Sequence, residues 1–282
     1  MIEQYQHTVT SSFLLWFDNY LLKKGQAFSN KTGSFFYYAD DRLDSRFKAF
    51  GSPYKQWVND SSINGAVIPS GVYVNGSFQP RSNSLLLDFT NGRALISGAA
   101  NSAAVTGQFS VKDFNIYFTN EGEEDLLIDK KYLPNSRIFS ADQSYIQPYD
   151  NAVPAIFISS QSMRNDPFAF GGEDTSKIQM KAVVMAENSY QLDGVLSIFA
   201  DSVNEVITPI PFSAHPTTEY GDIKSGYFSY DSLKNQYAVG NPLFVEEAIT
   251  SKLTDKARKS LANDLFIGFI DFEIHQQRYP RI

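Results

Sequence analysis

Residues 68–79 (IPSGVYVNGSFQ) and 84–96 (SLLLDFTNGRALI) decide the fold class of this chain. Each segment contains an Asn-Gly pair, Asn75-Gly76 in the first and Asn91-Gly92 in the second, between residues that favour strands. Asn-Gly between apolar runs is the strongest short-range signal for a β-hairpin, because a type I′ turn needs positive φ at both central residues. The two segments therefore predict two hairpins of an antiparallel sheet.

A two-residue loop fixes the register of each hairpin. It pairs Tyr73 with Phe78 in the first hairpin and Phe89 with Ala94 in the second. One face of the hairpins is then apolar, and such a face must be covered by a second sheet or by a helix. The pattern favours the core of a β-sandwich or meander, and a ligand site at the hairpin tips is the alternative.

The expected fold class is α+β, a mainly antiparallel β-sandwich or meander with a few packed helices. The chain has 282 residues, enough for one large domain or two smaller ones, and 43% of them are hydrophobic, so a packed core is expected. Aromatic residues make up 15% of the chain, with 23 Phe and 16 Tyr, which favours strands and broad contact surfaces.

Charge and cysteine content narrow the classes of function. The net charge of −7 argues against sequence-independent binding of nucleic acid, which needs a positive surface. The chain has no cysteine, which excludes disulfides, thiolate chemistry and zinc–thiolate sites, and is compatible with a reducing cytoplasm or with a particle assembled there. No segment reaches the length of a membrane span, so no membrane contact is expected.

Three regions are expected along the chain. Residues 1–60 hold an N-terminal arm and an amphipathic helix, 61–203 a β-rich core with a strand–helix unit, and 204–282 a loop excursion, a helix and a closing strand. Residues 1–58 carry a net charge of about +2, which leaves about −9 for the remainder. This asymmetry suits a head-to-tail contact between subunits.

An aromatic stripe marks the expected N-terminal helix, which begins at Ser11 or Ser12 and ends near Lys24. The stripe falls at helical spacing and consists of Phe13, Trp16, Phe17 and Tyr20. One interpretation packs this stripe on the core of the domain. The other docks it on a neighbouring subunit, because a wide apolar stripe at a chain terminus is a common assembly surface.

The middle of the chain contains the clearest α/β unit. Residues 178–186 predict a strand, and Asn188 or Ser189 then caps a helix that runs to about Val203. Residues 121–125 (EGEED) predict a solvated acidic turn, since they lack the regular spacing of a calcium loop.

The last part of the chain mixes loops with two regular elements. Residues 204–240 are rich in proline and glycine, and such a segment can extend onto a partner. Asn241 with Pro242 predicts the start of a helix that runs to about Lys252. Residues 265–275 predict the final strand, with a bulge near Gly268.

No set of residues marks a catalytic or metal site. His7, His215 and His275 lie far apart in sequence and share no ligand spacing, and no zinc-protease, serine-hydrolase or phosphate-loop motif occurs. Folding can still assemble a triad or a pair of carboxylates, because such sites are geometric rather than sequential. We nevertheless expect a protein that is not an enzyme, with no catalytic residue, no cofactor and no metal.

Five segments in order carry a resemblance to a known class of proteins. They are residues 54–56 (YKQ), 68–76 (IPSGVYVNG), 86–93 (LLDFTNGR), 114–121 (FNIYFTNE) and 166–172 (DPFAFGG). Together they resemble virion structural proteins of contractile-tailed, T4-like marine bacteriophages, and the resemblance extends over roughly residues 11–203.

This resemblance implies a particle component of the neck or tail, such as a connector or tail terminator. Such a protein is one subunit of a ring that joins head and tail and lets DNA pass without sequence-specific binding. The implied partners are copies of the chain itself and other neck or tail proteins, the implied location is the virion, assembled in the host cytoplasm, and no catalytic residues are implied.

A binding module is the alternative function, either in a baseplate or as an exposed β-sandwich that attaches to carbohydrate or to the host surface. Sugar binding stacks aromatic rings in a groove, for which Tyr227, Phe228 and Tyr230 are candidates. The candidate subunit-interface residues are these three and the N-terminal stripe: Phe13, Trp16, Phe17, Tyr20, Tyr227, Phe228 and Tyr230.

Overall fold

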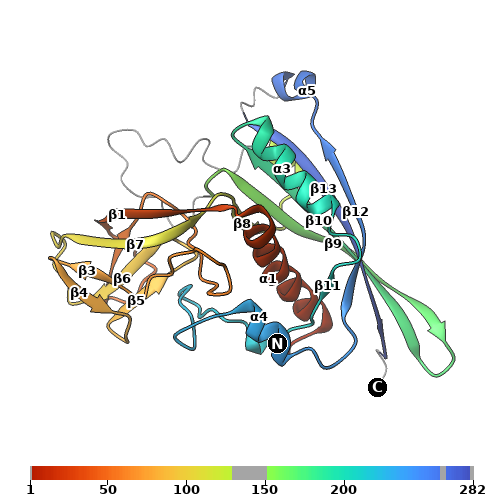
Figure 1. Cartoon of the computed structure of the whole chain (residues 1–282), viewed down its shortest axis with the longest axis horizontal. Helices are drawn as coiled ribbons and strands as arrows, with labels where there is room; N and C mark the ends of the chain where they lie inside the picture. Colours follow the sequence, from red (N-terminus) through yellow and green to blue (C-terminus); the bar gives the residue numbers. More distant parts are fainter. Residues whose placement is uncertain (1, 129–150, 261–264, 280–282) are drawn as a thin grey trace.

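Two sheets of mainly antiparallel strands form the framework of the chain (Figure 1), in a computed structural model that describes residues 2–128, 151–260 and 265–279. Among these residues, the first sheet has the order β4 (Ser77–Pro80), β3 (Gly71–Val74), β7 (Val105–Lys112), β1 (Phe28–Tyr38), β2 (Phe47–Gly51), β6 (Arg93–Ser97) and β5 (Leu85–Asp88). The second sheet has the order β11 (Val206–Ile207), β12 (Leu243–Lys252), β13 (Phe266–Arg278), β10 (Glu173–Ala186), β9 (Ala155–Ala169) and β8 (Asn115–Phe118). The predicted α+β, mainly β class is confirmed.

The first predicted hairpin is present as β3 and β4. Tyr73 pairs with Phe78, as expected, and Asn75 and Gly76 have φ values of +51° and +83°. The rings of Tyr73 and Phe78 also contact each other edge to face, with centroids 5.3 Å apart. The Asn-Gly pair therefore forms the two-residue turn that its conformational freedom favours.

The second hairpin, β5 and β6, has a different register from the prediction. Leu87, rather than Phe89, pairs with Ala94, so the loop contains four residues. The side chain of Asp88 explains the difference, because it accepts hydrogen bonds from the backbone N–H and side-chain amide of Asn91, at 3.0 and 2.8 Å. Such a side-chain turn competes with the tighter two-residue loop.

Helices α1 (Tyr5–Gly25) and α3 (Ser189–Ala200) pack on one face of the second sheet (Figure 1). Phe17 of α1 stacks on Phe199 of α3, with ring centroids 4.0 Å apart, and Phe13 meets Phe272 of β13 edge to face. The predicted cap of α3 is confirmed, since the side chain of Asn188 accepts a hydrogen bond from the backbone N–H of Gln191. The main core cluster contains residues from all three regions expected along the chain.

The first helix begins earlier than predicted. Residues 5–10, which the sequence suggests are a polar arm, are helical. Gln4 caps the helix through its backbone, since its N–H donates to Nδ1 of His7 and its carbonyl accepts from the N–H of His7, at 3.1 and 3.0 Å. Gln is not a preferred N-cap residue, so the start of the helix carried a weak sequence signal.

The predicted helix over residues 241–252 is wrong, because this segment is strand β12. Its side chains alternate at first between buried and exposed, with Leu243 and Val245 buried. The side chain of Asn241 does not cap a helix but donates to the carbonyl of Gln277, beside the partner strand β13. Pairing with a long central strand therefore overrides the local start signal.

Strand β13 follows the prediction, but its expected bulge near Gly268 does not occur. The register between β10 and β13 is continuous through Gly268. A Cβ at this position would lie 2.9 Å from a methyl group of Leu192, so glycine lets α3 approach the sheet closely. The register shift lies instead between Val245 and Glu247 of β12.

Two smaller segments also differ from expectation. An acidic turn is expected over residues 121–125, but residues 123–127 form the short helix α2 (Glu123–Leu127), whose Leu126 and Leu127 are buried. The proline-rich segment after α3 contains β11, the 3-10 turn η1 (Phe212–Ala214) and α4 (Tyr230–Gln236). Its loop packs on the first sheet of the same chain, where the carbonyl of Gly221 accepts a hydrogen bond from the N–H of Phe89.

Candidate functional site

The predicted N-terminal interface residues lie in the core. Phe13 and Phe17 have no exposed surface, and Trp16 and Tyr20 retain 4% and 8% exposure. Their rings contact Phe199 and Phe272 of the second sheet and its helix. The stripe therefore packs on its own domain, and the expectation that it docks on another subunit is corrected, because these side chains are not accessible on the surface.

The late aromatic residues are divided between core and surface. Phe228 and Tyr230 are 7% and 3% exposed, whereas Tyr227 is 61% exposed. The buried pair anchors the loop, since the Phe228 carbonyl accepts from the Ser61 hydroxyl and the Tyr230 N–H donates to Asp60. Two of the three rings are thus inaccessible to a sugar, and no three-ring stacking platform forms.

The three histidines do not form a metal or catalytic centre. His7 and His215 line the same groove, although they are far apart in sequence, while His275 lies on the second sheet with its Nε2 2.6 Å from a Glu273 carboxylate oxygen. Burial lowers the pKa of His215 below its ordinary value, and the charge of Lys224 adds to this effect. Within the described residues, no group of three or more candidate ligands is arranged to hold a metal ion.

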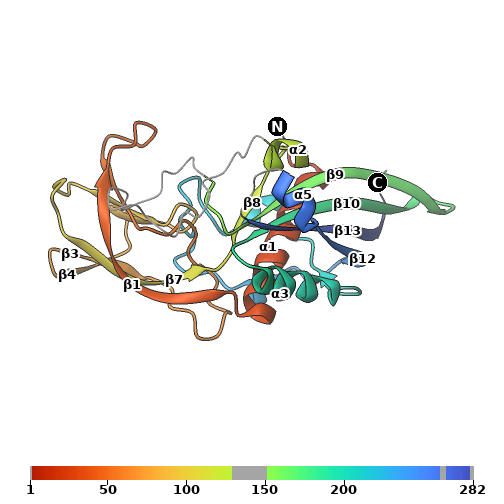
Figure 2. The same cartoon turned by 90° about the horizontal axis from the view of Figure 1, so that it is seen from above.

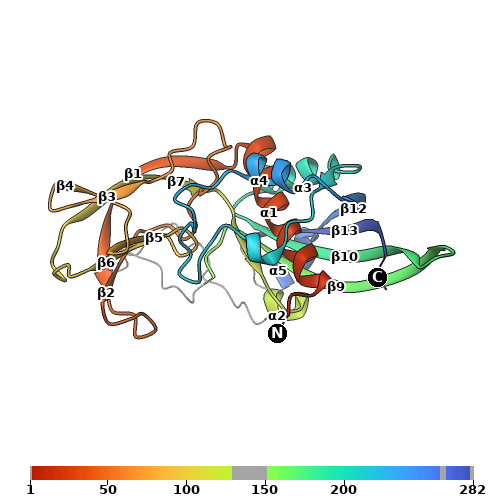
Figure 3. The same ribbon diagram turned by 90° about the horizontal axis from the view of Figure 1, so that it is seen from below.

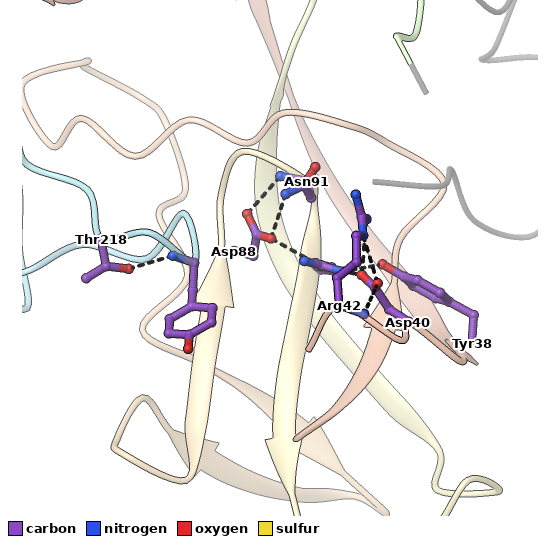
Figure 4. Close-up of polar contacts among 8 residues, drawn as sticks. Tyr38, Asp40, Arg42, Asp88, Asn91 and Thr218 are labelled. Carbon is purple, nitrogen blue, oxygen red and sulfur yellow. Dashed lines mark hydrogen bonds and ion pairs between the residues drawn. The ribbon is translucent and has the colours of Figure 1, made fainter. Parts of the chain in front are cut away.

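A buried ion network surrounds Arg93, at the start of β6 (Figure 4). The guanidinium donates to Asp40 at 2.6 Å, to Asp88 at 2.8 Å and to the hydroxyl of Tyr38 at 2.9 Å. Arg42 adds a second cation beside Asp40 at 3.0 Å. Sequence reasoning missed this network, although Asp88 and Arg93 flank the predicted Asn-Gly turn and provided a signal for it.

Burial and the neighbouring charges shift the pKa values of Asp40, Tyr38 and Arg93 away from neutral pH. Burial tends to raise the pKa of Asp40, but hydrogen bonds from Arg42 and Arg93 outweigh it and lower that pKa to about 2. Burial raises the pKa of Tyr38 to about 12. Burial lowers the pKa of Arg93, but the Asp88 charge and the Asp40 hydrogen bond raise it above its ordinary value. Ionised acids that are fully paired stabilise structure and do not transfer protons near neutral pH.

A groove runs along α1 beside the late loop. One part has a volume of about 450 Å³ and is lined by His7, Phe118 and Phe212, among others. The adjoining part has a volume of about 260 Å³ and contains the ion pair of Lys112 with Asp18, at 2.7 Å. Both parts share Leu14, Phe118 and His215. The lining mixes apolar rings with polar side chains and the ion pair of Lys112 with Asp18.

The face of the second sheet on the side away from α1 and α3, which we call the outer face, is polar around Lys177 and Lys181 and apolar toward Val183 and Met185, where Leu126 and Leu127 cover it. Side chains alternate across a strand, so the odd-numbered residues of β10 lie there, including Lys177 and Lys181. Each is paired with an acid: Lys177 with Asp166 at 3.8 Å, and Lys181 with Asp271 at 3.6 Å. The hydrogen bond with Glu123 is the main cause that raises the pKa of Lys181.

Strands β9 and β10 continue beyond the rest of the molecule as a hairpin arm (Figure 3). Gly171 and Gly172 at its tip have φ values of +106° and +88°, which glycine adopts without strain. Phe168 is 60% exposed at the tip, and Phe170 is fully exposed. Large aromatic side chains placed together at the end of an arm are typical of a contact with another protein.

Neither a scan against protein-family models nor a search of curated proteins found a match for this chain. No helix within the described residues is both long enough and apolar enough to cross a membrane.

Proposed function

We propose that this chain is a structural subunit of a contractile-tailed bacteriophage virion, and that copies of it form a ring in the neck or tail through which DNA passes. The observation that carries the proposal is the hairpin arm, which presents Phe168 and Phe170 to solvent beyond the body of the fold. An arm of this kind suits contact with another subunit. The arm alone does not indicate which assembly the protein belongs to. The assignment to a phage virion rests on the ordered segments that resemble phage virion proteins.

The outer face suits a surface that DNA passes without binding. Within the described part of the chain, its basic side chains Arg164, Lys177 and Lys181 each lie beside an acid, as Arg164 does beside Asp166 at 2.8 Å. Sequence-independent binding of DNA needs unpaired positive charge along the phosphate backbone. Placing this face toward the lumen of a ring would therefore present DNA with no cationic surface, in agreement with the net charge of −7.

A sugar-binding role receives no comparable support, because Phe228 and Tyr230 are buried and only Tyr227 of the predicted stack is accessible. The proposal likewise assigns the chain no catalytic activity, no cofactor and no membrane contact.

Two measurements test the proposal together. Light scattering and negative-stain images of the purified protein are expected to show a closed cyclic oligomer, formed either freely or on purified tails. Mass spectrometry and a reconstruction of purified phage particles are expected to place the chain in the neck or tail. A protein that remains a monomer under all these conditions and is absent from particles would overturn the proposal.

A further inference from the structure

The edges of the two sheets differ in whether the chain blocks them. At β8, the side-chain amide of Gln56 stands in for a strand, since it donates to the carbonyl of Ile116 at 2.8 Å and accepts from its N–H at 2.9 Å. Directly after β5, the late loop supplies the carbonyl of Gly221 to the N–H of Phe89. Proteins commonly block sheet edges in such ways to prevent unwanted strand addition.

Two long edges of the second sheet remain open. Strand β8 pairs with β9 only over residues 155–158, so the outer edge of β9 has no partner strand among the described residues from Ser159 onward. On the opposite side, β11 pairs with β12 only at Leu243 and Phe244. The loop before β11 bonds to Val245, and beyond it the edge of β12 is open among the described residues. Edges of this length are available for the addition of a strand from another chain.

The direction of the strands makes these two edges complementary. Strands β9, β10, β13 and β12 lie side by side in this order, and each neighbouring pair is antiparallel (Figure 2). Strands β9 and β12 therefore run in opposite directions. A second copy in the same orientation can add its β12 to β9 and continue the alternation without a break.

Charged side chains on the outer face indicate how β9 of one copy and β12 of the next copy would be aligned. Arg164 on β9 is well exposed, with a side-chain exposure of 70%, and Glu247 on β12 lies on the same face, since it pairs with Glu273 of β13. Opposite charges placed directly across two strands are favourable. Within one copy, Arg164 is level with Phe244 through Lys177 and His275, whereas Glu247 is level with Ser162 through Glu273 and Gln179, because β12 has a bulge before Glu247. Pairing Arg164 with Glu247 therefore displaces the next copy by two residues along β9. A stagger of this kind is required to close a sheet into a barrel.

We propose that the proposed ring is held together by antiparallel pairing of β9 of one copy with β12 of the next copy, with Arg164 facing Glu247. This inference rests on the proposed function and identifies the contact between copies. The contact is heterologous, because two different edges meet, and repeated contacts of this type form a ring when the rotation closes. In this register Ser162 faces Ile249, on the outer face of both strands.

Engineered cysteines test the register directly, because the chain contains none. Within one copy β9 and β12 are three strand spacings apart, about 14 Å, which is too far for a disulfide. Facing residues of an antiparallel pair lie about 4.5–5.5 Å apart and can be joined. The double variant Ser162→Cys with Ile249→Cys is therefore expected to form a ladder of covalent oligomers on mild oxidation. The control, Ser162→Cys with Ser77→Cys, is expected to form none.

Charge exchange supplies a second readout that does not require oxidation. Arg164→Glu and Glu247→Arg are each expected to raise the dissociation constant of the oligomer about tenfold in light scattering, and the double exchange to restore it to within about threefold. Arg46→Glu, on the first sheet, is the matched control and is expected to have no effect. A ring that forms normally but shows neither the ladder nor the exchange effect would overturn the edge pairing and leave the proposed function intact. Failure of the wild-type protein to assemble, with its absence from particles, would instead overturn the proposed function.

Discussion

Replacing Arg93 with methionine keeps most of the side-chain volume and removes the charge that Asp40 and Asp88 share. Both acids are at most 5% exposed in their side chains. Breaking a buried ion network by removing one partner leaves uncompensated charge, and typically costs about 3–5 kcal/mol of unfolding free energy. We expect Arg93→Met to lower the urea midpoint accordingly. Arg46→Met is the control and should leave the midpoint unchanged, because Arg46 and Asp44 pair at the surface.

Acid should weaken the same network through Asp40. Its folded-state pKa of about 2 lies below the ordinary value of 3.8, so its contribution to stability is complete above about pH 5 and is lost as the pH falls through 2. Asp40→Asn removes this contribution. We therefore expect the variant to be less stable than the wild type at pH 6, and the difference in urea midpoint to narrow steadily at pH 4 and pH 3. A difference that stays constant over this range would contradict the assignment.

At the scale of single elements, the aromatic contact between α1 and α3 is the test case. Phe17 has no exposed surface and stacks on Phe199. Truncating a buried phenylalanine removes apolar contacts and leaves a cavity, at a typical cost of about 3–5 kcal/mol. Phe17→Ala is expected to lose this amount in chemical unfolding. Tyr190→Ala should cost little, because Tyr190 is 87% exposed on α3. Equal effects would mean that α1 is not part of the core.

Elements with strong local signals were predictable, and those set by distant pairing were not. The hairpin at Asn75-Gly76 and the capped helix after Asn188 follow from residues within a few positions. The segment 243–252 has the local start of a helix and becomes a strand because β13 pairs with it. The second hairpin differs because the side chain of Asp88 forms its own turn.

The candidate site was less predictable than the fold for a related reason. The spacing of apolar residues in a sequence predicts which face of an element is apolar. It does not indicate whether the surface that covers this face belongs to the same chain. The stripe around Trp16 is covered by α3 and β13, which are far away in sequence. The open edges of β9 and β12 depend on how far β8 and β11 reach, which is a property of the sheet and not of any segment.

At the scale of the whole molecule, the pairing of basic with acidic side chains predicts that the protein does not bind DNA. We expect no retention of duplex DNA by the wild-type protein in gel-shift assays at moderate salt. Asp166→Lys removes the acid that pairs with Arg164 and Lys177, and should create a basic cluster whose DNA binding falls as salt is raised. Asp255→Lys, on α5 (Asp255–Ser260), is the matched control for net charge and should bind DNA less strongly. Strong binding of duplex DNA by the wild-type protein would contradict the proposal that DNA passes the protein without binding to it.

At the edge of β8, the side-chain amide of Gln56 occupies the backbone hydrogen-bonding groups of Ile116. Gln56→Leu leaves the β8 backbone at Ile116 without its hydrogen-bonding partner while the surrounding strands stay paired. Such an edge recruits strands from any neighbour. We expect this variant to reveal itself as turbidity that increases with protein concentration and storage time, while dilute samples keep a circular dichroism spectrum like that of the wild type. A single substitution at this position is therefore expected to change how the protein behaves at high concentration.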